Sequence, residues 1–206
     1  MTALPRGLYA ITPDETDTER LLALVQAALQ GGAAIVQYRN KQADSALRRE
    51  QALALLPLCR RAGVPLIVND DLDIAVAIDA DGLHLGADDG DLAAARAALG
   101  PGKLLGASCY DRLELAIEAR DRGADHVAFG AVFPSSTKPG AVRAPLTLFG
   151  QAPSAVGLPA VAIGGINLEN APAVVAAGAH AIAVISALFD APDVEQQARA
   201  FAALYR

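Results

Sequence analysis

The sequence is poor in the features that mark several classes of protein. Its only cysteines, Cys59 and Cys109, do not have the spacing of a metal site or a redox motif. There is no tract of Lys or Arg, and 17 basic against 23 acidic residues give a net charge of -6, so we expect no DNA or RNA partner. Two unpaired thiols fit a reducing compartment, and we predict a cytoplasmic protein.

Long apolar segments of the kind found in membrane or secreted proteins are also scarce. Residues 1–6 do not place an apolar segment behind a basic head, so we expect no secretory signal. Residues 171–189 are uncharged, but Pro172 and the turn-like residues 177–180 interrupt them. A helix, a turn and a strand are therefore expected there, and no membrane span.

What the chain does contain is a hydrophobic majority in a repeated pattern. With 53% hydrophobic and 19% charged residues, it can bury a sizeable core. Stretches with helical periodicity alternate with apolar runs rich in Val and Ile, at residues 7–12, 34–38, 66–69, 82–85, 103–107, 126–130, 159–163 and 181–185. Such runs indicate parallel strands covered by helices on both faces. We predict an α/β protein, a single (β/α)8 TIM barrel, with residues 1–206 forming one catalytic domain.

Several helix ends can be placed from local chemistry. Asp111 and Glu114 have the spacing of a capping box, and Gly31, Gly63, Gly123 and Gly178 stand where helices should end. Pro57 falls late in the helix expected over residues 44–61, which predicts a kink or an early end there. Residues 131–158 hold four prolines and only a weak helical pattern near residues 146–151. Long connections of that kind are usually functional.

Polar residues follow the second apolar run, on the face of a barrel where chemistry is normally found. Gln37, Arg39 and Lys41 alternate along the chain, so an extended backbone would place all three on one side. An amide, a guanidinium and an ammonium together suit a polyanion such as a diphosphate. A rim of solvated basic side chains would have the same spacing, and the residues alone do not choose between these readings.

Acidic residues follow the third and fourth runs. Asn69 and Asp70 come after the third run and Asp88 and Asp89 after the fourth, and two carboxylates on these neighbouring loops beside the basic group would suit Mg²⁺ shared between protein oxygens and a substrate phosphate. Carboxylates also cap helices, and we expect that simpler role for Asp91 and a first-turn position for Asp71 and Asp73.

The remaining strand ends carry hydroxyls and glycines. Ser108 ends the fifth run, and residues 134–140 combine hydroxyls with Lys138. Gly165 after the seventh run and Ser186 after the eighth have the positions of the phosphate site common in these barrels. The histidines are less informative, because His84 lies near the active rim without a His or Cys partner at ligand spacing, while His126 and His180 begin strands.

Almost the whole chain resembles the thiamine phosphate synthase family. The matching segments are residues 8–12 (LYAIT), 36–41 (VQYRNK), 67–70 (IVND), 81–86 (DGLHLG) followed by Asp89, 106–108 (GAS), 133–138 (FPSSTK), 163–166 (IGGI) and 184–186 (VIS). The resemblance implies a transferase of thiamine biosynthesis that condenses 4-amino-2-methyl-5-hydroxymethylpyrimidine diphosphate with a thiazole phosphate, plain or carboxylated. The products would be thiamine phosphate and pyrophosphate.

The resemblance also implies which residues bind each group. The pyrimidine diphosphate would contact Gln37, Arg39, Lys41, Asn69, Ser108 and Lys138, of which Arg39, Ser108 and Lys138 would be catalytic. The thiazole phosphate would contact Ser135, Thr137, Gly165, Ile185 and Ser186. Asp70 and Asp89 would hold Mg²⁺ as the cofactor. The partners would be these small molecules, with no nucleic acid or membrane, and a homodimer is left open.

The chain departs from the family at three positions. The family often has Leu and Glu where Tyr38 and Asn40 stand, and a basic or aromatic residue where Asp71 stands. These differences imply altered pyrimidine packing and an extra negative charge near the metal.

Two other functions compete with the synthase. A thiazole tautomerase-like isomerase would need a proton-transfer residue where this chain has Ser108. A non-catalytic regulator that binds thiazole phosphate is the other alternative, and the metal pair argues against it.

Overall fold

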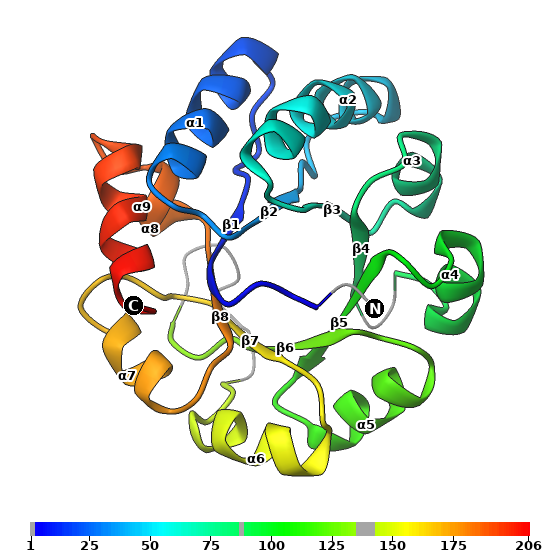
Figure 1. Cartoon of the computed structure of the whole chain (residues 1–206), viewed down its shortest axis with the longest axis vertical. Helices are drawn as coiled ribbons and strands as arrows, with labels where there is room; N and C mark the ends of the chain where they lie inside the picture. The colour runs from blue at the N-terminus through cyan, green and yellow to red at the C-terminus, as the bar shows by residue number, and fades with distance from the viewer. Residues whose placement is uncertain (1–2, 87–88, 135–142) are drawn as a thin grey trace.

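The architecture was determined from a computed structural model, which describes residues 3–86, 89–134 and 143–206. Eight parallel strands form a closed barrel in the order of the chain, as the sequence predicts (Figure 1). The strands are β1 (Gly7–Ile11), β2 (Ile35–Tyr38), β3 (Leu66–Asn69), β4 (Gly82–Leu85), β5 (Leu104–Tyr110), β6 (His126–Gly130), β7 (Ala160–Ile163) and β8 (Ala181–Val184). The prediction of a (β/α)8 barrel is therefore confirmed.

The helices surround the barrel as an outer ring. They are α1 (Thr18–Gln30), α2 (Ser45–Ala62), α3 (Leu72–Ala77), α4 (Leu92–Leu99), α5 (Leu113–Asp121), α6 (Thr147–Ala155), α7 (Ala171–Ala176), α8 (Ser186–Phe189) and α9 (Val194–Ala203). The four-residue α8 directly follows β8, so an extra helix stands at the strand end before the outer helix α9.

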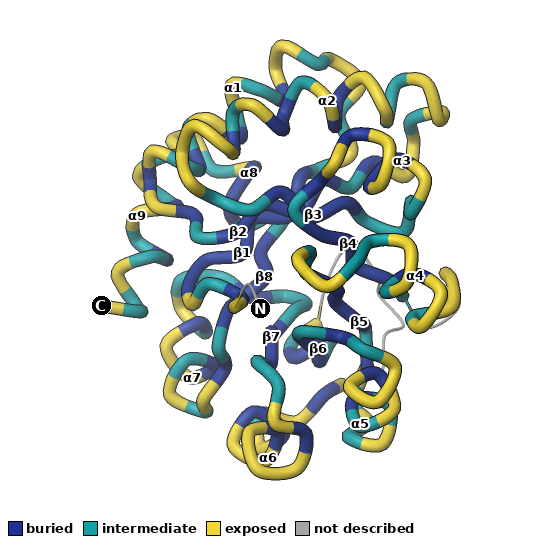
Figure 2. Tube along the Cα trace, turned by 45° about the vertical axis from the view of Figure 1, so that its right-hand side comes forward, coloured by how far each residue is buried: buried dark blue, intermediate teal, exposed yellow. Residues whose placement is uncertain are grey.

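Alternation along each strand separates two cores. One set of strand residues faces the helices, so that Val36, Val68 and Leu83 pack with the apolar faces of α2 and α3. The other set fills the barrel, where Tyr9, Ile35 and other apolar residues form an inner cluster. Figure 2 shows the result, with buried strands at the centre and exposed outer faces on the helices.

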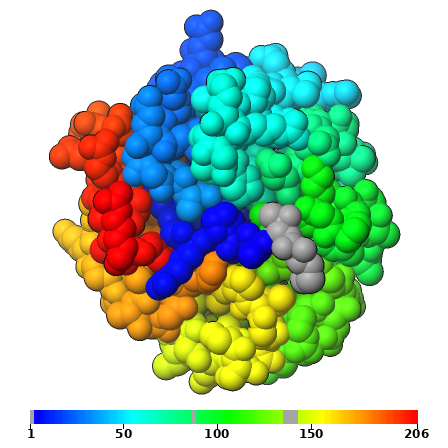
Figure 3. Space-filling view, in the orientation of Figure 1, coloured from blue at the N-terminus to red at the C-terminus, as the bar shows by residue number. Residues whose placement is uncertain are grey.

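The amino-terminal segment closes one end of the barrel. Leu4 is buried within the inner cluster, and its carbonyl oxygen lies 2.9 Å from His180 Nε2. Figure 3 shows this segment in dark blue lying across the centre of that face. His180 therefore has the structural role expected from its place at the start of a strand, and the barrel opens at its other end.

Two local expectations about helix ends are not met. Helix α2 continues past Pro57 to Ala62, so of the kink or early end predicted there the early end does not occur. Pro57 and Leu53, whose carbonyl the proline leaves without an intrahelical donor, are both exposed, while buried Leu55, Leu56 and Cys59 hold the helix on the barrel. The capping box of Asp111 is also absent, because α5 begins at Leu113 and its N-cap residue, Arg112, makes no side-chain cap.

The uncharged stretch near the carboxyl end is divided as expected. Residues 171–189 form α7, the turn at Gly178, β8 and α8. Among the described residues, no helix combines the length and apolar character needed to cross a membrane.

Candidate active site

The open end of the barrel holds a cavity of about 390 Å³, here called the mouth. It brings together every predicted site residue that the structure describes, namely Gln37, Arg39, Lys41, Asn69, Asp70, Asp89, Ser108, Gly165, Ile185 and Ser186. These residues come from six strand ends, which explains why residues so far apart in the sequence share one site. Ser135, Thr137 and Lys138 lie outside the described residues.

Basic side chains occupy the β2 side of the mouth. Strand β2 ends at Tyr38, and the following loop carries Arg39 and Lys41. Arg39 Nη1 lies 3.0 Å from Asp14 Oδ1, and Lys41 Nζ lies 3.4 Å from Asp70 Oδ2. Both cations therefore sit beside a carboxylate that a more highly charged anion could replace as their partner.

Two carboxylates meet at the backbone of Gly86. Asp70 has a left-handed backbone with a φ of 61°, and its Oδ1 accepts a hydrogen bond of 3.4 Å from Gly86 N. Asp89 also lies against the same residue, since a Cβ added to Gly86 would be 2.1 Å from Asp89 Oδ2. A side chain at this position would therefore displace the Asp89 carboxylate from its present place.

Asp91 and Asp73 have the simpler roles that the sequence predicts, whereas Asp71 caps α3 instead of lying in its first turn. Asp91 caps α4 by accepting from Ala94 N, and Asp73 lies in the first turn of α3. Asp71 is the N-cap of α3 and also pairs with Arg48 at 3.6 Å. The extra negative charge expected from Asp71 is thus partly neutralised within the protein.

Ser108 is held by a histidine that the sequence did not assign to the site. Ser108 Oγ lies 3.0 Å from His84 Nε2, and His84 lines the mouth. The His84 ring centroid is 5.7 Å from that of the fully buried His126. Gly106 lies against this pair, because a Cβ there would be 2.2 Å from His126 Nε2 and 2.4 Å from His84 Nδ1.

Both histidines are neutral at physiological pH. Burial lowers the pKa of His84 to about 4, although nearby Asp70 opposes the shift. Burial also lowers the pKa of His126 well below its usual value, and His84 and His180 add to this effect. Neutral His84 can therefore orient the Ser108 hydroxyl without adding a charge to the mouth.

This burial predicts a pH dependence of stability. Between about pH 6.5 and 4 the unfolded chain binds more protons at these histidines than the folded chain. The free energy of unfolding should therefore decrease as the pH is lowered through this range. Each histidine should contribute up to about 1.4 kcal/mol per pH unit in this range. Denaturant unfolding at several pH values should show a shallower fall for His84→Asn than for the unsubstituted chain. Identical slopes would contradict the buried, neutral state of His84.

Gln37 is anchored from inside the barrel. Its Nε2 donates to Tyr9 Oη at 2.9 Å, and both side chains are buried. Burial raises the pKa of Tyr9, so the hydroxyl keeps its proton, and the amide oxygen of Gln37 is left to face the mouth.

The side of the mouth after β7 and β8, here called the backbone wall, has no charged side chain among the described residues that line it. Gly165 has a φ of 65°, and a Cβ there would be 2.3 Å from the carbonyl oxygen of Pro134. The Gly165 carbonyl accepts a hydrogen bond of 3.0 Å from Asn170 Nδ2, which fixes the loop after β7. Ile185 and Ser186 continue this wall at the start of α8.

Two departures from the family do not act as predicted. Tyr38 and Asn40 do not line the mouth but bond to Gln51 on α2, so an effect on pyrimidine packing by direct contact is wrong. Tyr38 faces the helices because Gln37, its neighbour along the strand, faces the barrel.

Sequence reasoning missed residues that shape the mouth without carrying an obvious motif. Tyr9, His84 and Tyr110 line the mouth, and Tyr110 has a left-handed φ of 53° after a shift in the β5–β6 register. Asp14 does not line it but pairs with Arg39. For Tyr9 and His84 the alternation along β1 and β4 was the available signal, since polar residues at inward positions near a strand end face the site.

Comparison with known proteins agrees with this geometry. Residues 8–188 match the family model described as thiamine monophosphate synthase. A thiamine-phosphate synthase of Methylobacillus flagellatus is 60% identical over 97% of this chain and 95% of that protein. A thiamine-phosphate synthase of Aromatoleum aromaticum is 57% identical over 97% of this chain and 96% of that protein.

A solved structure extends the likeness to three dimensions. A thiamine phosphate pyrophosphorylase from Pyrococcus furiosus superposes with a TM-score of 0.85 at 36% identity, covering 96% of this chain and 94% of that one. A 3-hexulose-6-phosphate synthase, with a TM-score of 0.70 and 21% identity, shares the fold.

Proposed function

Because this chain belongs to the thiamine monophosphate synthase family, we propose that its mouth binds the two substrates of that reaction on opposite sides. The enzyme condenses hydroxymethylpyrimidine diphosphate with thiazole phosphate and releases pyrophosphate, in thiamine biosynthesis. The observation that carries the division into two sides is the contrast between the charged wall after β2 and the backbone wall after β7 and β8.

The reaction replaces one bond at the pyrimidine methylene. The carbon–oxygen bond to diphosphate breaks, the diphosphate leaves with the bonding electron pair, and the thiazole nitrogen forms the new carbon–nitrogen bond. The amino-substituted ring stabilises a positive methylene, so no protein nucleophile is needed. The protein has to stabilise the departing anion and hold the second substrate in line.

The charged wall supplies the first requirement. Arg39 and Lys41 would bind the diphosphate, and Asn69 lies beside them in the mouth, with its Nδ2 donating to Asp70 Oδ2 at 2.6 Å. Gln37 and Ser108 would hold the pyrimidine ring through fixed dipoles, because Tyr9 and His84 orient them. Lys138 is proposed as a further cation on the diphosphate from its sequence match alone.

Asp70 and Asp89 are proposed as the protein ligands of Mg²⁺. Their oxygens suit this ion, and both lie beside the cations that would bind the diphosphate. Among the described residues no group of three or more acidic, His or Cys side chains could hold a metal, which fits an ion that takes its other ligands from substrate and water. When bound, the ion would neutralise charge on the diphosphate.

The backbone wall would hold the thiazole phosphate. Gly165, Ile185 and Ser186 can offer backbone N–H groups and one hydroxyl to an anion at close range. Ser135 and Thr137 are proposed contacts from the sequence match. This placement would set the thiazole across the mouth from the diphosphate.

A side chain at Gly165 tests the thiazole side. Gly165→Val should raise the KM for thiazole phosphate by about 100-fold, since the left-handed backbone and the close Pro134 carbonyl force the loop to move. Ser186→Ala should cost less, about 10-fold, through one lost hydrogen bond to the phosphate. Steady-state kinetics with each substrate varied in turn should show little change in the KM for pyrimidine diphosphate. An unchanged KM for thiazole phosphate in both variants would contradict the assignment.

Product analysis tests the function itself. The purified chain, with both substrates and Mg²⁺, should release thiamine phosphate and pyrophosphate in equal amounts. An isomerised thiazole phosphate as the only product would indicate the tautomerase alternative, and binding without turnover would indicate the regulator. Free, buried Cys59 and Cys109 support the proposal that the enzyme works in the reducing cytoplasm.

A further inference from the structure

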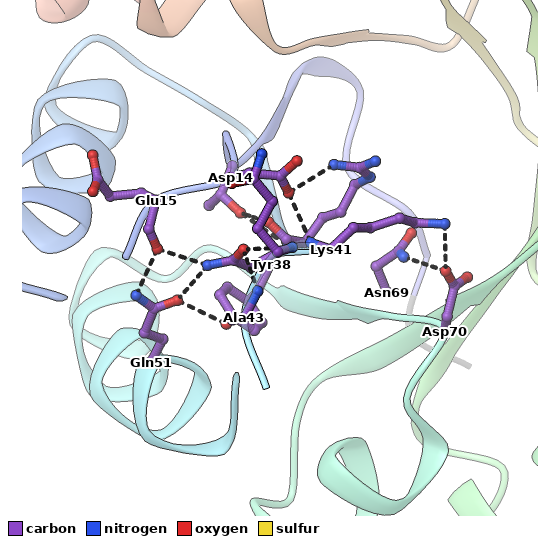
Figure 4. A network of polar contacts seen from close by, with 12 residues as sticks. Asp14, Glu15, Tyr38, Lys41, Ala43, Gln51, Asn69 and Asp70 are labelled. Atoms are coloured by element: carbon purple, nitrogen blue, oxygen red, sulfur yellow. Dashed lines mark hydrogen bonds and ion pairs between the residues drawn. The ribbon is translucent and has the colours of Figure 1, made fainter. Parts of the chain in front are cut away.

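The loop that carries Arg39 and Lys41 is tied to the outer helices by a buried polar cluster, here called the Asn40 socket (Figure 4). The socket consists of Tyr38, Asn40 and Gln51 with the backbone carbonyl of Glu15. All three side chains are 3% exposed or less. None of them lines the mouth.

The hydrogen bonds of the socket fix the Asn40 amide in one orientation. Asn40 Nδ2 donates to the Glu15 carbonyl at 2.6 Å and to Gln51 Oε1 at 3.1 Å. Asn40 Oδ1 accepts from the backbone N–H groups of Gln42 and Ala43 at 3.2 and 3.1 Å. A flipped amide would place its NH2 group against the N–H donors of Gln42 and Ala43 and its oxygen against two acceptors, so this side chain has a single satisfied placement.

Gln51 completes the socket from α2. Its Oε1 accepts from Tyr38 Oη at 2.8 Å as well as from Asn40, and its Nε2 donates to the Glu15 carbonyl at 2.9 Å. Burial raises the pKa of Tyr38, so its hydroxyl remains a donor. The socket therefore links β2, the loop after β2, α2 and the loop after β1 through neutral hydrogen bonds.

Asn40 stands between the two cations in the sequence, so the socket that holds Asn40 also affects where Arg39 and Lys41 point. Arg39 and Lys41 line the mouth, whereas Asn40 between them is bonded to Gln51 on α2, so the bonds that hold Asn40 also fix the backbone from which both cations project. The same loop is held from the other side, where Asp14 Oδ1 accepts from Lys41 N at 2.7 Å and Thr12 Oγ1 accepts from Arg39 N at 2.9 Å.

A second position is open to the Lys41 ammonium group if the loop after β2 changes its conformation. A side cavity of about 260 Å³ borders the mouth and is lined by Tyr38, Asn40, Lys41, Arg48 and Asp71, among others. Lys41 is half exposed, and acidic Asp71 lies in this second cavity. The side cavity shares Lys41 and Asp70 with the mouth, so a loop that is not fixed would let the ammonium group turn toward Asp71 and away from the rest of the mouth.

We propose that Asn40, with Gln51 and Tyr38, is a positioning residue that aims Arg39 and Lys41 at the diphosphate of the pyrimidine substrate. This inference rests on the proposed function of the mouth. It names residues that touch no substrate and act through the two cations.

The test compares Asn40→Ala with Asn170→Ala. Asn170 is a matched control because its amide fixes the loop that holds Gly165 on the thiazole side. Asn40→Ala should raise the KM for pyrimidine diphosphate by about 10- to 100-fold and leave the KM for thiazole phosphate within about 2-fold. Asn170→Ala should show the reverse. Equal effects of Asn40→Ala on both KM values, or no effect on the first, would overturn the proposal.

Two further measurements keep the outcome clear. Tyr38→Phe removes one hydroxyl and retains the ring, so a folded protein is expected even if Asn40→Ala unfolds, and its KM for pyrimidine diphosphate should rise by about 2- to 5-fold. Calorimetric titration with inorganic pyrophosphate and Mg²⁺ measures the cation pair without catalysis. Weaker pyrophosphate binding in both socket variants supports the positioning role even if the chain makes no thiamine phosphate, whereas unchanged binding overturns it.

Discussion

Arg39→Ala is expected to weaken binding of the pyrimidine diphosphate by about 1.5 to 3 kcal/mol, roughly 10- to 150-fold. Arg39 lines the mouth, and only 16% of its side chain is exposed, so its hydrogen bonds to an anion form away from bulk water. The loss should appear both in the affinity for the substrate and in kcat, because the same guanidinium would stabilise the diphosphate as it leaves.

Arg49→Ala is the control for charge alone. Arg49 is exposed on α2, outside the mouth, and its removal changes the net charge by the same amount. Titration calorimetry should show near-normal diphosphate affinity for Arg49→Ala. Equal affinity in the Arg39 and Arg49 variants would remove Arg39 from the diphosphate site.

Removal of the metal should abolish activity, and Asp89→Ala should reduce it by about 100-fold or more, since a bound ion supplies several kcal/mol of charge stabilisation. Asp70→Ala should have a similar effect. Gly86→Ala should also reduce activity, although it keeps both carboxylates, because its Cβ would lie 2.1 Å from Asp89 Oδ2 and displace that carboxylate.

Asp91, a neighbouring acid outside the proposed metal site, provides the control variant. Asp91→Ala removes the cap of α4, which should cost about 1 kcal/mol of stability while activity is retained. Activity should vanish with a chelator and return with added Mg²⁺. Full activity in the chelator would refute the assignment of Asp70 and Asp89, and greater loss from Asp88→Ala than from Asp89→Ala would show that the wrong acid of this loop was chosen.

The sequence predicts the barrel because parallel strands buried on both faces leave a strong pattern. The eight apolar runs match the eight strands closely, and reading the residue after each run locates the mouth. The signal is strong because the carboxyl ends of all eight strands meet at one face, so residues such as Asp70 and Ser186 converge whatever the loop details are.

Features that depend on the orientation of side chains could not be predicted from this sequence pattern. The partnership of His84 with Ser108 requires both the β4–β5 register and the space left by Gly106, and no spacing within the sequence reports either. Asn40 looked like a mouth residue because its neighbours are. Its burial against Gln51 depends on the packing of α2 on the barrel, which the local pattern does not encode.

The most direct test of the two-sided mouth is a crossed calorimetric titration of Arg39→Ala and Gly165→Val, with each substrate added alone in the presence of Mg²⁺. Arg39→Ala should bind pyrimidine diphosphate at least about 10-fold more weakly and thiazole phosphate normally. Gly165→Val should bind thiazole phosphate more weakly and pyrimidine diphosphate normally. If both variants lose affinity for the same substrate, the two sides do not hold separate substrates and the account is wrong.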